Sequence, residues 1–183
     1  MSADERREQI IDVTVALLGE HGAQVTTRQS AEAAGIAEGT IFRSFDDKDQ
    51  LIEAAIDRVM DPRPGLEAIE RLDASMPFPD FLSSVVRVQV EETTRAAGFL
   101  HALGASKKPR RHLELDEAIR FRVNSIFAPY RDQLRIEPAA MSHLLRAIVI
   151  GSVFHRDLGN ALGPDQIVDV LLSGVVTSPT QEN

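Results

Sequence analysis

The stretch TTRQSAEAAGIAEGTIFRSFDDKDQLI, residues 26–52, decides how this chain folds at its N-terminal end. Thr26 and Gln29 have the spacing of a capping box, in which a threonine hydroxyl accepts a hydrogen bond from a free backbone N–H at the start of a helix. The alanines that follow keep the helix slim enough for close packing. The stretch therefore predicts a helix from Thr26 or Thr27 to Gly35.

A tight turn and a second helix are expected next. Gly35 suits a left-handed C-cap, and Ile36 can pack back on the helix that ends there. A second helix is predicted from Ala37 or Glu38 to about Phe45, after a turn of about three residues. This is the arrangement of a helix-turn-helix, whose second helix enters the major groove of DNA.

The rest of the chain also predicts helices, because its apolar residues recur three and four positions apart and alternating β-branched runs are missing. Ser2 and Glu5 have capping-box spacing, and Gly22 is expected to stop the first helix. The fold class is therefore all-α. Further helical segments are predicted at 46–60, 65–75, 78–97, 98–104, 112–134, 138–158 and 165–176.

A change in composition between residues 61 and 79 marks a domain junction. Four prolines lie in this stretch and bracket one short helical piece. We therefore expect a helix-turn-helix domain at 1–60 and a second helical domain at 61–183. Pro138 and Pro164 are expected at helix starts, where proline is tolerated.

Composition narrows the function classes. The 183 residues include no cysteine, which excludes disulfides, thiolate catalysis and zinc–thiolate sites. No stretch reaches the ~20 apolar residues that span a bilayer, and MSADERREQI is no signal peptide, so a soluble, intracellular protein without a membrane partner is expected. Common enzyme motifs are missing, and His101, His143 and His155 lack metal-ligand spacing. We expect no enzyme, no cofactor and no metal.

The acidic net charge of the chain does not favour nucleic-acid binding. The chain carries 20 basic and 28 acidic side chains, a net charge of −8, and residues 1–60 hold six basic and twelve acidic ones. DNA-binding domains are usually basic, because phosphate neutralisation supplies much of their affinity. The basic run KKPRR at 107–111 is interpreted as a solvated loop. Any DNA-binding function must therefore depend on the motif.

The motif resembles that of the TetR (tetracycline-repressor) family. The family pattern is matched by AAGI at 33–36, EGT at 38–40, IFRSF at 41–45 and DDKD at 46–49, followed by Leu51. The resemblance implies a three-helix N-terminal DNA-binding domain and a C-terminal helical bundle. It also implies a dimeric, sequence-specific transcriptional regulator of the bacterial cytoplasm, expected to be a repressor that a small apolar effector releases from a pseudo-palindromic operator.

The same resemblance implies DNA contacts, residue by residue. Arg43 is the candidate for recognising a guanine edge, because its guanidinium group can donate two parallel hydrogen bonds. Thr40 would contact a phosphate or a thymine methyl group, and Lys48 a phosphate. Solvated surface roles are the alternatives for Arg43 and Lys48. The full predicted set is Thr26, Thr27, Arg28, Glu38, Gly39, Thr40, Phe42, Arg43 and Lys48.

Three residues depart from the family pattern. Phe42 replaces a tyrosine and has no hydroxyl for a phosphate, Ser44 replaces a residue that is often aromatic, and Ser30 occupies a position that is usually apolar. Together with the acidic balance, these departures predict modest non-specific affinity and dependence on a few contacts. A steep salt dependence of DNA binding would contradict this hypothesis.

The second domain is expected to dimerise and to sense a ligand. Segments 138–158 and 165–176 are apolar on more than one face, which favours a two-fold bundle of two helices from each subunit. The alternative is that they are inner helices of a monomer. The family implies an apolar ligand cavity, for which the candidates, each of them alternatively plain core, are Phe81, Val85, Gln89, Phe99, Leu103, Phe121, Ser125, His143 and Phe154.

Two other functions stay open at this point. One is a helical small-molecule-binding or enzymatic domain whose helix-turn-helix is vestigial, which the acidic N-terminal region and Phe42 favour. The other is an architectural or cell-division DNA binder without an effector.

Overall fold

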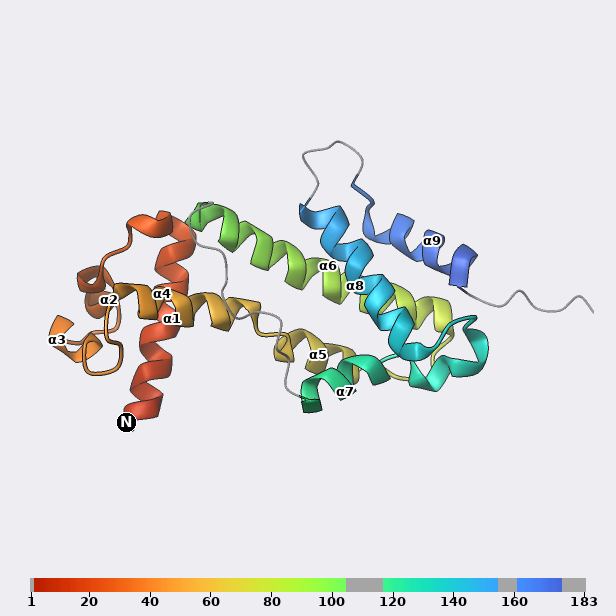
Figure 1. Cartoon of the computed structure of the whole chain (residues 1–183), viewed down its shortest axis with the longest axis horizontal. Helices are drawn as coiled ribbons and strands as arrows, with labels where there is room; N and C mark the ends of the chain where they lie inside the picture. The colour runs from red at the N-terminus through yellow and green to blue at the C-terminus, as the bar shows by residue number, and fades with distance from the viewer. Residues whose placement is uncertain (1, 105–116, 155–160, 176–183) are drawn as a thin grey trace, which may run out of the picture. The chain divides into compact units, whose positions relative to one another are not determined.

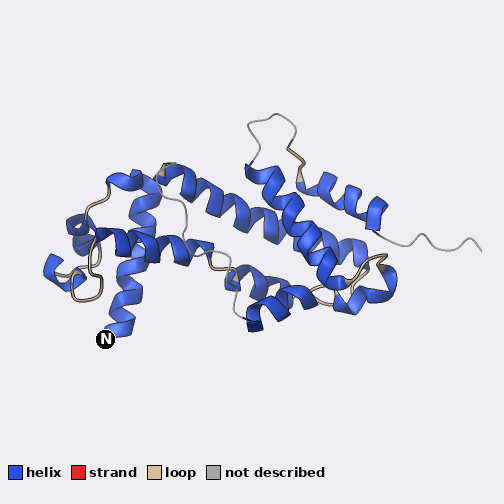
Figure 2. Ribbon diagram, in the orientation of Figure 1, coloured by secondary structure: helices blue, strands red, loops and turns tan. Residues whose placement is uncertain are grey.

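The computed structural model describes residues 2–104, 117–154 and 161–175. Regular structure in these residues is helical, and no extended β-strand occurs among them (Figure 2). The all-α prediction is thus confirmed. Within the same ranges, no helix combines the length and apolar character that crossing a membrane requires.

The chain divides into two compact units. Residues 1–61 and 95–114 make the first unit, and residues 62–94 and 115–183 make the second. Each unit therefore combines two separate stretches of sequence. The functional division at residue 60 expected from the sequence stays a prediction.

The first unit is built from short helices near the N-terminus and the end of one long helix (Figure 1). Both predicted features of its first helix are confirmed: Ser2 and Glu5 form a capping box, and Gly22 caps the C-terminus with φ +60°. The elements are α1 (Ala3–His21), the 3₁₀ turn η1 (Gly22–Gln24), α2 (Thr27–Ala33), α3 (Glu38–Ile41), α4 (Lys48–Met60) and the last part of α6 (Phe78–Leu103).

Two apolar clusters hold the first unit together. One joins α1 to the helix-turn-helix and contains Ile10, Ala31, Ile41, Phe45 and Leu51, all nearly inaccessible. The other joins α1 and α4 to the end of α6, and its buried members are Leu18, Val25, Ile52, Ala55, Ile56, Val59, Ala96, Phe99 and Leu103. The core of the first unit is therefore completed by residues that come after position 94.

The turn after α1 packs directly on the end of α6. A Cβ atom added at Gly22 would lie 2.4 Å from the carbonyl oxygen of Ala102, closer than real Cβ atoms approach backbone. The positive φ of Gly22 also favours glycine. The position therefore needs glycine for two independent reasons.

The second unit contains an aromatic cluster. The rings of Phe81 and Tyr130 lie 4.8 Å apart, Phe78 and Phe127 pack around them, and the Tyr130 hydroxyl donates to the carbonyl of Met76 at 2.9 Å. The elements are α5 (Arg63–Glu70), the first part of α6, α7 (Glu117–Ser125), the 3₁₀ segment η2 (Ala128–Gln133), α8 (Pro138–Phe154) and α9 (Pro164–Val175). Both predicted proline helix starts are confirmed.

Several predicted helix bounds are wrong. The helices expected at 78–97 and 98–104 are one helix of 26 residues, because Gly98 continues the helix instead of ending it. The helix expected at 112–134 ends at Ser125 and is followed by η2, since Pro129 cannot donate a helical hydrogen bond. The KKPRR run and His155 lie outside the described residues, as do parts of the segments predicted at 112–134, 138–158 and 165–176.

Candidate nucleic-acid interface

The start of α2 has the predicted capping box. The Thr26 hydroxyl accepts a hydrogen bond from the Gln29 backbone N–H at 3.2 Å, and the Gln29 side chain accepts one from the Thr26 N–H at 2.8 Å. These bonds fix the first turn, in which Arg28 is exposed and Thr27 is half-buried. The side chains predicted to approach DNA from α2 are therefore held on a rigid helix start.

The turn between α2 and α3 is a Schellman motif. Gly35 has φ +67°, its N–H donates to the carbonyl of Glu32 at 3.1 Å, and the Ile36 N–H donates to the carbonyl of Ala31 at 3.0 Å. Ile36 packs on the apolar cluster beneath the motif. The predicted left-handed cap and the apolar contact after it are both confirmed.

The second helix of the motif is shorter than predicted. It spans Glu38–Ile41, and the chain then turns tightly, with the backbone N–H groups of Ser44 and Phe45 both donating to the carbonyl of Ile41 at 2.9 Å. The expected extension of the helix to Phe45 is wrong, because the tight turn brings the Phe45 ring into the core. Arg43 lies in this turn.

The helix buries one side and exposes the others. Ile41 is fully buried, Thr40 is half-buried, and Glu38, Gly39 and Arg43 are exposed. Phe42 is 51% exposed, which is unusual for a large apolar side chain in a small domain. Residues 26–45 as a whole hold two arginines and two glutamates, so this surface is balanced in charge even though the chain is acidic.

Side chains of α1 contact both turns of the motif, the one after α2 and the one after α3. The Arg7 Nη1 atom donates to the carbonyl of Ser44 at 2.6 Å, and the guanidinium lies over the Phe45 ring. The Gln9 amide donates to the carbonyl of Ala34 at 3.3 Å. Sequence reasoning missed Arg7 and Gln9, because nothing in a charged first helix distinguishes a side chain that contacts a turn from one in solvent.

Lys48 is the first residue of α4 and is half-buried. Asp47 caps this helix by accepting from the Gln50 N–H at 2.8 Å. The Lys48 ammonium donates to the carbonyl of Ala23 at 3.2 Å. In the free protein, therefore, this lysine stabilises the turn after α1, and contact with a phosphate would require its side chain to swing out.

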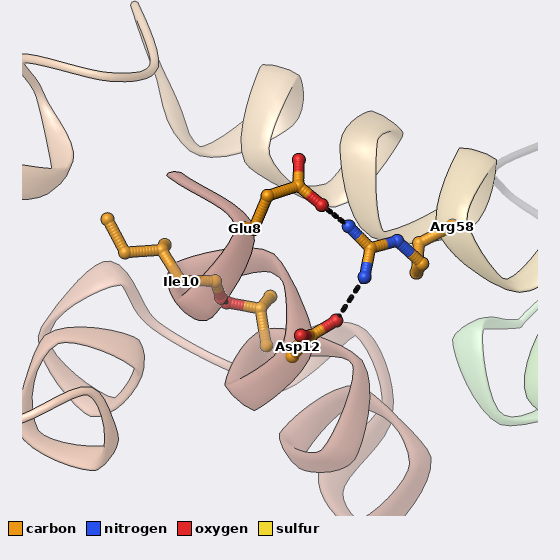
Figure 3. Close-up of polar contacts among 5 residues, drawn as sticks. Glu8, Ile10, Asp12 and Arg58 are labelled. Atoms are coloured by element: carbon orange, nitrogen blue, oxygen red, sulfur yellow. Dashed lines mark hydrogen bonds and ion pairs between the residues drawn. The ribbon is translucent and has the colours of Figure 1, made fainter. Parts of the chain in front are cut away.

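Part of the acidic surplus is neutralised within the first unit. Arg58, in the last turn of α4, forms ion pairs with Glu8 and Asp12 of α1 (Figure 3). Ten helical residues, roughly 15 Å along the helix axis, separate Arg58 from Lys48. These two carboxylates are thus paired at the end of α4 that lies far from Lys48.

The structure does not bring the predicted ligand-binding residues together. Phe99 and Leu103 are buried in the first unit, whereas Phe81 and Val85 are buried in the second. Phe81 packs in the aromatic cluster. Gln89 and Ser125 are half-buried, Ser125 donates to the carbonyl of Phe121, and the exposed members of the predicted set are Phe121, His143 and Phe154.

Two buried polar atoms in the second unit were missed by sequence reasoning. The Thr94 hydroxyl oxygen and the Asn124 side-chain carbonyl oxygen are inaccessible, and neither has a hydrogen-bond partner in the described structure. Arg122, the neighbouring charged side chain on α7, has a partner of its own, because its guanidinium donates to Glu70 at 2.8 and 2.6 Å. Buried polar atoms without partners are uncommon in proteins, and helical periodicity alone gave no signal for them.

Comparison with known proteins agrees with the motif geometry. Residues 10–55 match the family model described as bacterial regulatory proteins, tetR family. This match includes the Thr26 capping box, the Gly35 turn and the Asp47 cap. The N-terminal segment thus matches the DNA-binding domain of the TetR family. The resemblance inferred from residues 33–51 is therefore confirmed.

Curated proteins that resemble this chain match it over part of their length. The nucleoid occlusion factor SlmA of Haemophilus ducreyi is 42% identical over 60 residues, which are 32% of this chain and 30% of SlmA. The transcriptional repressor KstR of Rhodococcus jostii is 33% identical over 117 residues, 56% of this chain and 52% of KstR. The chain thus spans about a third to a half of these relatives.

Solved structures with a similar helical fold cover nearly all of the chain. A TetR-family protein from Vibrio parahaemolyticus superposes with a TM-score of 0.59 at 22% identity, covering 94% of this chain and all of that one. NalD of Pseudomonas aeruginosa, a repressor of a multidrug efflux pump, gives a TM-score of 0.54 at 23% identity, covering 97% of this chain and all of NalD. At these identities the likeness concerns the fold.

Proposed function

We propose that the chain is a sequence-specific DNA-binding transcriptional regulator of the bacterial cytoplasm, a dimeric repressor that a small apolar effector releases from a pseudo-palindromic operator. One observation carries the proposal: the capped helix α2 and the Gly35 turn present α3 with exposed side chains on a rigid core. A helix held in this way can enter a major groove without rearrangement of its backbone.

The proposed DNA contacts come from three places in the first unit. Exposed Arg43 offers the two parallel donors that recognise the O6 and N7 atoms of guanine. Arg28 and Thr40 would contact backbone or base edges beside it, and Lys48 would exchange the Ala23 carbonyl for a phosphate. Because α3 is flanked by few cations, affinity depends on these contacts more than on general charge.

Dimerisation is proposed through α8 and α9, which pack against one another. On α8, Leu145 and Val149 are buried, whereas Leu144, Ile150 and Phe154 on the remaining sides are between 36% and 46% exposed. On α9, Val170 is 49% exposed. A second copy of the chain would bury these side chains, and a two-fold protein matches two operator half-sites.

The effector is proposed to bind within the second unit. Val85 and Gln89 would line its site, and the inaccessible oxygens of Thr94 and Asn124 would gain a partner from a ligand that carries a hydrogen-bond donor. Burial of apolar ligand surface would supply most of the affinity. The ligand shifts DNA binding only to the extent that it prefers one of two dimer conformations.

The test is binding of the full chain to labelled promoter DNA, measured by fluorescence anisotropy with excess non-specific competitor. We expect Arg43→Ala to weaken specific binding about tenfold or more, the loss of one bidentate base contact. Arg71→Ala is the matched control, because the side chain of Arg71, the C-cap residue of α5, is 75% exposed and lies outside the motif. A wild-type chain that prefers no palindrome over competitor would contradict the proposal.

A second candidate function is an architectural DNA binder without an effector. The specific observation that favours it is the 42% identity to a nucleoid occlusion factor over 60 residues, a higher identity than the one to the repressor KstR. Chromatin immunoprecipitation separates the two functions. A repressor occupies a few promoters, whereas an architectural protein occupies many sites dispersed over the chromosome.

A further inference from the structure

Glu38 brings a carboxylate to the surface that is proposed to meet DNA. It is the first residue of α3 and is exposed. Residues at the N-terminal end of a recognition helix contact base edges, so a side chain in this position lies where sequence is read. A carboxylate is repelled by phosphates, so the only DNA groups that it can bind are hydrogen-bond donors.

The carboxylate is held in place by the preceding helix. The Thr27 hydroxyl donates to Glu38 Oε1 at 2.6 Å. Thr27 follows the N-cap residue Thr26, so its position is fixed by the capping box at the start of α2. No other described residue donates to this carboxylate, which leaves Oε2 as an oriented acceptor. Orientation before binding lowers the entropic cost of a contact.

The neighbour of Glu38 on the helix surface is apolar. Phe42 lies four residues later, keeps helical dihedral angles and is 51% exposed. Side chains at this spacing lie side by side on a helix. A ring beside the carboxylate reduces competition from water when the surface meets DNA, which strengthens a hydrogen bond made there.

The edges of the four bases in the major groove differ in what they offer a carboxylate. Guanine presents the acceptors N7 and O6 and thymine the acceptor O4, all of which repel it. Adenine has an amino group, but its neighbouring N7 atom repels the second carboxylate oxygen. Cytosine presents its N4 amino group without an adjacent acceptor on the same base. Cytosine is therefore the base that suits Glu38.

We propose that Glu38, held by Thr27, specifies a cytosine in each operator half-site. This inference rests on the proposed DNA-binding function and adds one element of the operator sequence. Thr27 acts as a positioning residue, because its hydroxyl contacts the carboxylate and need not contact the base.

The experiment is selection of random duplex DNA by the full chain, followed by sequencing and competition binding. Wild type is expected to select a cytosine at one position per half-site and to lose about tenfold in affinity when that base pair is changed. Glu38→Gln is expected to shift the preference to adenine, which a glutamine amide recognises through N6 and N7. Thr27→Val is expected to keep cytosine with weaker discrimination.

Glu32→Gln is the matched control, since it removes the same charge from an exposed position on α2. It is expected to leave the selected sequence unchanged. An identical consensus for wild type and Glu38→Gln, with affinity raised equally for every sequence, would overturn the inference and leave the carboxylate as a general repulsive charge. Failure of the wild type to enrich any sequence would instead overturn the proposed function. Circular dichroism confirms that each variant is folded.

Discussion

The guanidinium carbon of Arg7 lies 4.1 Å from the centroid of the Phe45 ring, and its Nη1 atom donates to the carbonyl of Ser44. One side chain of α1 thus holds the turn that follows α3 by a cation–π contact and a hydrogen bond. The recognition segment has only four α-helical residues of its own, so its position depends on such contacts from outside.

Arg7→Met removes both contacts and keeps an apolar side chain. We expect a loss of about 1–2 kcal/mol in the free energy of unfolding, from one cation–π contact and one charged hydrogen bond in a half-buried position. Specific DNA affinity is expected to fall as well, because the turn loosens. Thermal melts and anisotropy titrations measure the two effects. Arg6→Met is the control, and equal melts for the two variants would contradict the assignment.

Ser30 is fully buried, and its hydroxyl oxygen has no hydrogen-bond partner in the described structure. Ser30→Ala removes this unsatisfied group, so we expect a gain of about 1 kcal/mol in the free energy of unfolding and a melting temperature about 2–4 °C higher. Ser142 is equally buried, but its hydroxyl donates to the carbonyl of Pro138. Ser142→Ala is therefore expected to give no gain. A lower melting temperature for Ser30→Ala would show that the hydroxyl is satisfied.

Gly35→Ala tests the Schellman turn. An added Cβ would meet no atom within 4 Å. The substitution is therefore expected to lower the free energy of unfolding only through the positive φ of this residue, by about 1–2 kcal/mol. Gly39→Ala in α3 also has open space around the new atom, but its backbone is helical. That substitution is expected to be neutral or stabilising. Chemical denaturation compares the two, and equal free energies of unfolding would exclude backbone strain as the cause.

A pH dependence is expected from the pair of Glu70 and Arg122. Hydrogen bonds from Arg122 hold the pKa of the Glu70 carboxyl below its ordinary value of 4.5. Because the folded state prefers the ionised form, the pair stabilises the fold above the unfolded pKa, and this contribution is lost as pH falls through the lower folded pKa. Arg122→Met should therefore lower the melting temperature at pH 7 and have less effect near pH 3.

The control for this pair is Arg131→Met. Arg131 also pairs with a carboxylate, Glu137, but both side chains are more than 60% exposed. Solvent screens such pairs, so we expect little change in melting temperature. A cost of Arg122→Met that is the same at both pH values would mean that the lost packing of the arginine stem, and not its charge, is responsible.

Local signals in the sequence predicted the parts of the fold that depend on neighbouring residues. Capping boxes at Ser2 and Thr26 and the glycine caps at Gly22 and Gly35 involve residues within five positions of one another, and all are confirmed. The same signals misplaced the end of α3 and divided α6 in two. Those bounds depend on tertiary packing, on the burial of Phe45 in one case and of Phe99 in the other.

The candidate site was predictable in part for the same reason. The family pattern placed Arg43 and Thr40 on or beside the recognition helix and Arg28 at the start of the helix before it. The Arg7 contact and the Thr27–Glu38 bond, in contrast, join residues 37 and 11 positions apart. The ligand-binding set was drawn from the family resemblance, which places residues on helices but does not distinguish core from cavity. Phe99 and Leu103 therefore came out as core of the first unit.

The completion of this core by residues 96–103 has a consequence for biosynthesis. When the ribosome has made residues 1–61, the helices of the DNA-binding segment are present, but the apolar surface around Leu18, Val25 and Ile56 still lacks its covering residues. Translation must continue through the first part of α6 before the nascent chain can close this core. We therefore expect the first unit to reach its full stability only after residue 103 has left the exit tunnel.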